Sequence, residues 1–251
     1  MNFIFVSPHF PKTYWNFCDR LHRNGVNVLG IGDAPFDEIP WELKQCLTEY
    51  YRVNDLGNYD EMLRAVAYFT FHYGKIDWIE SNNEYWLEMD AQLRTDFNIN
   101  TGAKNDFIER IKYKSKMKES YIAAGVPVAR HHMVHENGLD DARAFVAQVG
   151  YPVIVKPDNG CGAEATYKLR NFTELKEFYD EPHNVRYIME EYINGTIVSF
   201  DGVADSHCVP LFYTSNVFPT PMLDIVSQKG DLSYWTQKSV PAALKDVGFR
   251  T

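Results

Sequence analysis

Short apolar runs alternate with longer amphipathic segments over the first hundred residues. The apolar runs predict strands at residues 3–6, 26–31, 50–53 and 76–80. The segments with helical periodicity predict helices at residues 12–24, 59–73 and 83–97. Strands that alternate with helices of this length imply parallel βαβ units, which bind ligands at the carboxyl ends of their strands.

The pattern changes after Gly102. A basic segment at 106–124 predicts a helix, which Gly125-Val126-Pro127 ends before the chain becomes extended. Further strands are predicted at residues 128–134, 151–157, 167–169 and 187–193, with helices at 139–150 and 172–179 and an extended run to 203. We therefore expect an α/β domain at 1–105 and a second, α+β domain at 106–251.

Composition narrows the class of protein. A length of 251 residues suits one large or two small domains, and 15% aromatic residues argue against a disordered chain. The 25 Lys+Arg against 34 Asp+Glu give a net charge of -9. We expect no nucleic-acid partner, because duplex binding needs a net basic face, and any bound phosphate must meet a local basic site.

Neither a membrane nor a secreted location is indicated. No apolar stretch approaches the roughly 18 residues that span a bilayer, and the apolar N-terminus lacks basic residues and stops at Pro8. We expect no membrane partner and a cytoplasmic location by default. The four cysteines form no Cys-x-x-Cys pair, so reduced thiols are expected rather than a zinc or dithiol site.

Lys156 is the most informative single residue. It ends an apolar strand between Pro152 and Pro157, which hold its ammonium on a rigid stem. A compact positive charge held in this way suits a phosphate oxygen. The position of Lys156 is explained equally well by a lysine that simply reaches into solvent where the strand meets water.

The loop after this strand favours the phosphate. Gly160 and Gly162 let backbone N–H groups approach an anion, and the small side chains of Cys161 and Ala163 keep the loop thin. A lysine, a glycine-bearing loop and a return strand form a hairpin that can cradle phosphate. Glycine pairs also mark ordinary hairpin turns.

A third stretch, Met189-Glu190-Glu191-Tyr192-Ile193-Asn194-Gly195, delivers two carboxylates from an apolar strand into an Asn-Gly turn. With these stretches in this order, the chain resembles the ATP-grasp superfamily, which includes carboxylate-amine ligases and carbamoyl-phosphate-synthase-like proteins. The segment from Lys114 to Pro127 resembles the family's lysine-bearing helix. The resemblance implies a partial ATP-grasp domain behind an N-terminal Rossmann-like domain, with a small subdomain at about 125–190 and a second subdomain from 191.

The resemblance also implies roles for residues. Lys114 and Lys156 would contact the phosphates of ATP and stabilise the transferring charge, and the backbone of residues 160–165 would close over them. In the hinge formed by residues 190–193, Glu190 and the carbonyl of Glu191 would accept from the adenine amino group, and the N–H of Ile193 would donate to a ring nitrogen, with Tyr192 between them. The alternative for Lys114 is a solvated basic helix face on which Lys112, Lys116 and Lys118 are equivalent.

Two departures from the family pattern stand out. Ile197 lies where many relatives place a glutamate for the ribose hydroxyls, so ribose binding would rest on another group, such as Asp201, or be weak. The family's Mg²⁺ ligands follow a Glu-x-Asn pattern in a C-terminal segment, and no such pattern follows the hinge in residues 195–251, so we expect these ligands beyond residue 251 and assign no metal ligand here. Asp201, Asp205 and Asp224 could recruit a metal, but surface solvation explains them at least as well.

The resemblance implies an ATP-dependent carbon–nitrogen ligase. Such an enzyme uses ATP and Mg²⁺ to activate a small carboxylate as an acylphosphate, which an amine then attacks. Two alternatives stay open: a non-catalytic or truncated ATP-binding module, and an enzyme like carbamoyl-phosphate synthase or biotin carboxylase that activates bicarbonate or carbamate. Whether this chain is active, and whether it forms a homodimer, also stays open.

Overall fold

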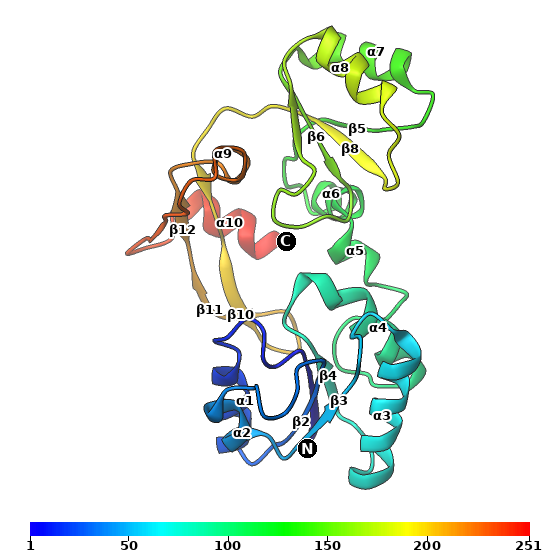
Figure 1. Cartoon of the computed structure of the whole chain (residues 1–251). Helices are drawn as coiled ribbons and strands as arrows, with labels where there is room; N and C mark the ends of the chain where they lie inside the picture. The colour runs from blue at the N-terminus through cyan, green and yellow to red at the C-terminus, as the bar shows by residue number, and fades with distance from the viewer. The chain divides into compact units, whose positions relative to one another are not determined.

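The computed structural model describes the backbone of residues 1–251 and every side chain except those of residues 227 and 228. The chain divides into two compact units, the N-terminal unit Met1–Lys112 and the C-terminal unit Tyr113–Thr251 (Figure 1). Among the described residues, every helix is too short or too polar to cross a bilayer.

The N-terminal unit is built on a parallel sheet. Its elements are β1 (Asn2–Val6), α1 (Trp15–Arg23), β2 (Asn27–Gly32), α2 (Trp41–Cys46), β3 (Glu49–Arg52), α3 (Tyr59–Tyr73), β4 (Trp78–Glu80), the 3₁₀ turn η1 (Glu84–Trp86), α4 (Leu87–Asp96) and α5 (Glu109–Lys112). The strands pair in parallel in the order β3-β2-β1-β4. The predicted α/β class is confirmed.

Strand periodicity explains why helices cover both faces of this sheet. Ile4 of β1 packs into the core under α3 and α4, whereas its neighbour Phe5 packs into a second core with α1 and α2. Side chains alternate between the faces of a strand, so the continuous apolar run of β1 supplies both cores. Figure 1 shows the two helix pairs on opposite sides of the sheet.

The C-terminal unit begins with a helix followed by an antiparallel sheet. Its first elements are α6 (Lys114–Ala123), β5 (His131–Met133), α7 (Leu139–Val149), β6 (Val153–Pro157), β7 (Tyr167–Leu169), α8 (Phe172–Asp180) and β8 (Tyr187–Glu191). The strands pair in the order β5-β8-β6-β7. Apolar residues of α7 and α8 pack on one face of this sheet against Val153, Val155 and Met189, so the side chains at positions 154, 156 and 190 project from the other face.

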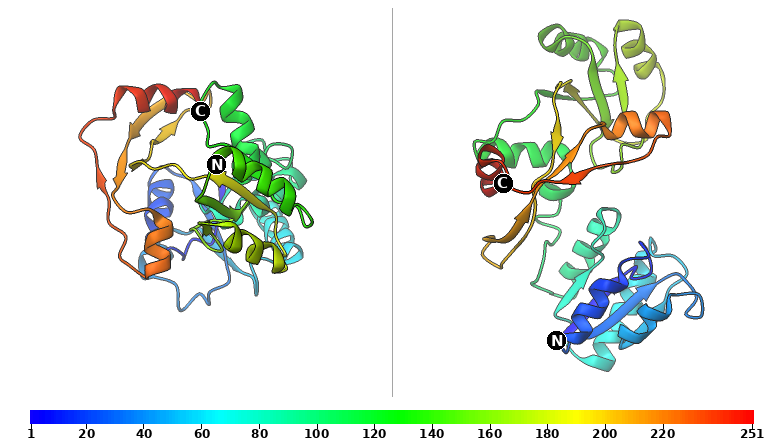
Figure 2. Two further views of the ribbon diagram at one scale, coloured as in Figure 1. Left: turned by 90° about the horizontal axis from the view of Figure 1, so that it is seen from above. Right: turned by 90° about the vertical axis from the view of Figure 1, so that its left-hand side faces the viewer.

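The rest of this unit consists of short strands and two helices. These elements are β9 (Ile197–Val198), β10 (Asp201–Ala204), β11 (Pro210–Thr214), β12 (Asn216–Phe218), α9 (Met222–Gln228), β13 (Trp235–Thr236) and α10 (Ala242–Arg250). Phe249 of α10 packs edge-on against Tyr213 of β11, with ring centroids 5.3 Å apart, and α10 lies beside β10 and β11 in Figure 2.

The basic segment at 106–124 differs from its prediction as a single helix. It forms α5 and α6, separated by Tyr113, which has an extended backbone with φ of -93° and ψ of 124°. The physical reason is tertiary: the first residues of α6 bond to Asp158, which lies far along the chain.

Candidate functional site

Lys156 and Glu190 form an ion pair on the face of the antiparallel sheet opposite α7 and α8. Lys156 lies on β6 and Glu190 on β8, where Glu190 pairs in register with Ile154 and Lys156 with Ile188. The two charged residues are therefore diagonal neighbours on one face. The distance from Lys156 Nζ to Glu190 Oε2 is 2.7 Å. Lys156 accordingly lies next to the end of a buried strand, and its ammonium contacts a carboxylate.

Glu190 has a second basic partner that the sequence analysis did not single out. Lys118 of α6 places its Nζ 3.0 Å from Glu190 Oε1 and donates to the carbonyl of Ala129 at 3.2 Å. Burial alone would raise the pKa of the Glu190 carboxyl, but Lys156 and Lys118 together outweigh burial and the pKa is lowered. Glu190 is thus a buried carboxylate held ionised between two ammonium groups.

Asp158 fixes the start of α6 beside the end of β6. This fully buried carboxylate accepts from the backbone N–H of Ser115 at 2.8 Å and from its hydroxyl at 2.7 Å. The backbone N–H of Lys114 donates to the carbonyl of Asp158 at 2.9 Å. An acceptor from a distant part of the chain therefore satisfies N–H groups that a helix leaves unpaired in its first turn.

Lys114 consequently lies beside the predicted phosphate loop. Its Nζ donates to the carbonyl of Gly160 at 2.5 Å and to that of Asp158 at 3.4 Å. Lys112 instead reaches Glu84 within the N-terminal unit, and the exposed Lys116 pairs with Glu119. The alternative in which the lysines of this segment are equivalent is wrong, because each has a different environment.

The loop at 160–165 has an unusual backbone. Gly162, Ala163 and Ala165 all have positive φ, at 65°, 60° and 49°. A Cβ on Gly160 would lie 2.8 Å from the Cβ of Pro157, so this position requires glycine. Turn conformations of this kind aim successive N–H groups into a concavity that suits an anion. Cys161 is exposed within this loop.

The hinge begins where β8 ends. Glu191 pairs with Arg130: its carboxylate accepts from Arg130 Nε at 2.7 Å, and its N–H donates to the Arg130 carbonyl at 3.0 Å. The hydrogen bonds that the carboxylate accepts from Arg130 Nε and from the backbone N–H of Arg130 lower the pKa of the Glu191 carboxyl. The Nζ of Lys168 lies 3.9 Å from the ring centre of Tyr192, and the side chain of Ile193 is 64% exposed. The hinge thus presents an exposed apolar side chain next to a strand end.

The acidic residues beyond the hinge serve local contacts. Asp201 accepts from Asn216 Nδ2 at 3.0 Å and from the hydroxyl of Ser199, and Asp205 accepts from backbone N–H groups of its own turn. Ile197 is exposed on β9. The described side chains contain no group of three His, Cys, Asp or Glu residues arranged to hold a metal ion.

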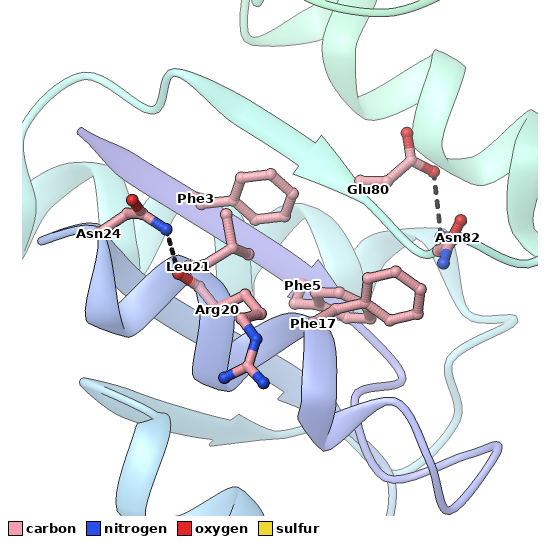
Figure 3. Close-up of a pocket in the computed structure, with 8 residues that line it drawn as sticks. All are labelled: Phe3, Phe5, Phe17, Arg20, Leu21, Asn24, Glu80 and Asn82. Carbon is pink, nitrogen blue, oxygen red and sulfur yellow. Dashed lines mark hydrogen bonds between the residues drawn. The ribbon is translucent and has the colours of Figure 1, made fainter. Parts of the chain in front are cut away.

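The N-terminal unit has a separate pocket of about 320 Å³ beside α1 and β4, lined by Phe3, Phe5, Phe17 and Leu21 together with four polar residues (Figure 3). Its acidic group, Glu80, is paired with Arg94 at 2.8 Å. The pocket therefore offers an apolar wall without an uncompensated charge.

Comparison with known proteins identifies the C-terminal unit. Residues 114–231 match the family model described as the ATP-grasp domain. These residues form an ATP-grasp domain. The match begins at Lys114 and includes Lys156, the loop at 160–165 and the hinge, so the ATP-grasp domain contains the residues proposed for the site.

Solved structures share this fold over nearly the whole chain. An L-amino acid ligase from Bacillus licheniformis aligns with 99% of this chain at a TM-score of 0.67 and 15% identity. The biotin carboxylase domain of 2-oxoglutarate carboxylase from Hydrogenobacter thermophilus, solved with MgADP, ADP and bicarbonate, also aligns with 99% at 0.67 and 16% identity. This chain covers 59% of the first structure and 68% of the second. At these identities the likeness establishes the fold alone.

Curated relatives match shorter segments. A D-alanine–D-alanine ligase of Francisella tularensis is 26% identical over 115 residues, which are 41% of this chain and 39% of that enzyme. The carbamoyl phosphate synthase large chain of Methanothermobacter thermautotrophicus is 29% identical over 80 residues, 32% of this chain and 7% of that protein. The chain thus spans less than half the length of either curated relative.

Proposed function

We propose that the ATP-grasp domain binds ATP, with the phosphates on Lys114, Lys156 and the loop at 160–165. The observation that carries the proposal is that two lysines from different elements are anchored around the end of β6: Lys114 contacts Gly160, and Lys156 is the penultimate residue of the strand. In a chain of net charge -9, this local positive charge is what a polyphosphate needs.

The hinge suits the adenine ring. The exposed side chain of Ile193 offers an apolar contact, while the N–H of Ile193 and the carbonyl of Glu191 supply the donor and acceptor that an adenine edge requires. Glu190 can accept from the adenine amino group through lone pairs that its two lysines leave unused, because a carboxylate has about four acceptor sites. Asp201 is the proposed group for the ribose hydroxyls in place of Ile197.

We propose that the whole protein uses this site as an ATP-dependent ligase, which activates a carboxylate as an acylphosphate for attack by an amine. The family match supports an ATP-grasp ligase, and a D-alanine–D-alanine ligase and an L-amino acid ligase among the similar proteins favour a carboxylate and an amine as substrates. Lys114 and Lys156 would stabilise the charge on the transferring phosphoryl group.

Activation of bicarbonate is the second candidate reaction. It is favoured by the similarity to a biotin carboxylase domain solved with MgADP and bicarbonate. Magnesium would supply charge neutralisation to the phosphates in either reaction. The described residues do not fit a Mg²⁺ site, so we assign no ligand to the metal and derive no step through it.

Isothermal titration calorimetry with ATP tests the site, with and without Mg²⁺. We expect Lys156→Ala and Lys114→Ala each to weaken binding about tenfold or more, because a hydrogen bond to a charged group contributes roughly 1.5–3 kcal/mol. Lys116→Ala is the matched control, since Lys116 is an exposed lysine of the same helix that pairs with Glu119. Equal ATP binding by wild type and Lys156→Ala would refute the assignment.

A phosphate-release screen tests the reaction. The ligase would be established by two results together: ATP turnover that depends on both a carboxylate and an amine, and formation of an amide product. Turnover that depends on bicarbonate would favour the second reaction. If the full-length protein bound ATP but showed no turnover with a broad range of carboxylates and amines, a non-catalytic module would be favoured.

A further inference from the structure

Lys118 has a buried ammonium that the proposed contacts with ATP do not use. Its side chain is 11% exposed, against 40% for Lys116 two residues earlier on the same helix. Burying a lysine is costly unless its charge is paired. Lys118 is paired with Glu190 and donates to the carbonyl of Ala129, so its position is determined by the carboxylate of the hinge.

The two lysines around Glu190 differ in their access to solvent. Lys156 is 26% exposed, whereas Lys118 and Glu190 are 11% and 10% exposed. Lys156 lies at the strand end next to the loop, and Lys118 reaches Glu190 from α6. Of the two ammonium groups, that of Lys156 is therefore the one that can turn towards a ligand.

If Lys156 leaves Glu190 for a phosphate oxygen, the carboxylate loses one of its partners in a site that water reaches poorly. An unpaired buried carboxylate is strongly unfavourable. Lys118 removes this difficulty, because its ammonium stays 3.0 Å from Oε1 and keeps the carboxylate compensated. The arrangement of two cations and one anion thus leaves one positive charge for the nucleotide.

We propose that Lys118 is a positioning residue that holds the charge of Glu190 and thereby releases Lys156 to bind the nucleotide phosphates. The inference rests on the proposed ATP site. Without Lys118, Lys156 would be the one cation left on Glu190 among the described side chains and would be retained there, so ATP would bind more weakly although Lys118 touches no part of it.

ATP calorimetry on variants of Lys118 tests the proposal. We expect Lys118→Met to weaken ATP binding about tenfold, the factor that corresponds to roughly 1.4 kcal/mol, which is at the lower limit for a hydrogen bond to a charged group. Lys118→Arg should restore most of the affinity, because Arg supplies the same charge to Glu190. Lys116→Met is the control, and it should bind as wild type does.

A double variant separates this role from a merely structural one. Glu190→Gln removes the negative charge that retains Lys156 and keeps a side-chain oxygen that can accept from the adenine amino group, so Lys118→Met/Glu190→Gln should bind ATP more tightly than Lys118→Met alone. If Lys118 only stabilised α6, the added Glu190→Gln would give no recovery. Thermal unfolding of each variant checks that the ATP-grasp domain is folded.

The outcomes distinguish the two proposals. Wild-type affinity in Lys118→Met, with binding lost in Lys156→Ala, would overturn the role of Lys118 and leave the ATP site standing. Failure of Glu190→Gln to recover binding in the double variant would also overturn that role. Absence of ATP binding by the wild-type protein would overturn the proposed function and this inference together.

Discussion

Replacing Asp158 with alanine should loosen the start of α6 and displace Lys114. The carboxylate of Asp158 is fully buried and accepts two hydrogen bonds from Ser115, at 2.8 Å from its backbone N–H and 2.7 Å from its hydroxyl. Asp158→Ala leaves this N–H without its acceptor in a place where Ser115 is only 7% exposed. The start of α6 then lacks both hydrogen bonds to the Asp158 side chain and the negative charge of its carboxylate.

The structure sets the magnitude of the effect. Two hydrogen bonds to a charged acceptor contribute roughly 1.5–3 kcal/mol each, part of which is offset because the buried carboxylate no longer needs to be desolvated. We therefore expect Asp158→Ala to reduce the local stability of α6 by about 3 kcal/mol. Asp158→Asn keeps an oxygen for the N–H of Ser115 and should cost about 1–2 kcal/mol, since charge-assisted hydrogen bonds are roughly twice as strong as neutral ones.

Hydrogen exchange measured by mass spectrometry on peptides that cover α6 reports this change directly. A loss of about 3 kcal/mol corresponds to exchange roughly 100-fold faster. ATP titration of the same variant should show weaker binding, because loosening the first turn of α6 would displace Lys114, although the backbone carbonyl of residue 158 that accepts from Lys114 remains. Asp180→Ala is the control, since Asp180 is an exposed carboxylate that pairs with the exposed Lys176 one helical turn away.

Unchanged protection of α6 in Asp158→Ala would refute the reasoning. So would equal effects of Asp158→Ala and Asp180→Ala, because the argument depends on burial. If Asp158→Ala lost protection of α6 from hydrogen exchange but kept its ATP affinity, Asp158 would still stabilise α6. The claim that this stabilisation positions Lys114 for ATP would then be wrong.

Two further predictions concern the N-terminal unit. Burial raises the pKa of Asp90 from 3.8 to about 7, so the folded state keeps a proton that the unfolded chain loses; stability should fall by up to about 4 kcal/mol as pH rises from about 4 to 7. The free energy of unfolding, measured by urea denaturation at a series of pH values, should fall less steeply with pH in Asp90→Asn than in wild type. An identical slope in the two proteins would contradict the prediction. Arg94 is 2% exposed, donates to the Ile79 carbonyl at 2.6 Å and pairs with Glu80 at 2.8 Å. Arg94→Leu should destabilise the unit by about 3–5 kcal/mol in thermal unfolding, whereas the exposed Arg64→Leu should change it little.

Elements with strong local signals were predicted well from the sequence. The helix expected at residues 59–73 matches α3, because Asn58 accepts from the N–H of Glu61 at its start and Gly74 takes φ of 81° at its end. Both signals act within one turn of the helix and need no tertiary partner. The parallel class of the first sheet likewise follows from the order of strands and helices.

Elements that depend on distant contacts were missed. The separation of α5 from α6 at Tyr113 has no sequence signal, since the basic pattern continues through it, and it reflects the bonds from Asp158 to Ser115. The helix α10 was not predicted either. Its aromatic Phe249 packs on Phe200 and Tyr213, residues that lie far from it in sequence.

The candidate site shows the same division. Lys156 and the glycine-bearing loop could be proposed from local sequence, because each is a local motif on a strand or a turn, whereas the hinge was proposed from the resemblance to the ATP-grasp superfamily. Lys118 could not be separated from Lys116, although its spacing of four residues from Lys114 is a signal that the two share a helix face.

The sequence by itself determined the alternation of strands and helices and the local motifs, because hydrophobic periodicity and backbone preferences act over a few residues. Only the tertiary structure decided which lysine meets which carboxylate. Glu190 lies more than thirty residues from Lys156 and still farther from Lys118, and sheet register and the placement of α6 bring the three together. Charge pairing depends on distance in space, which residue order alone does not specify.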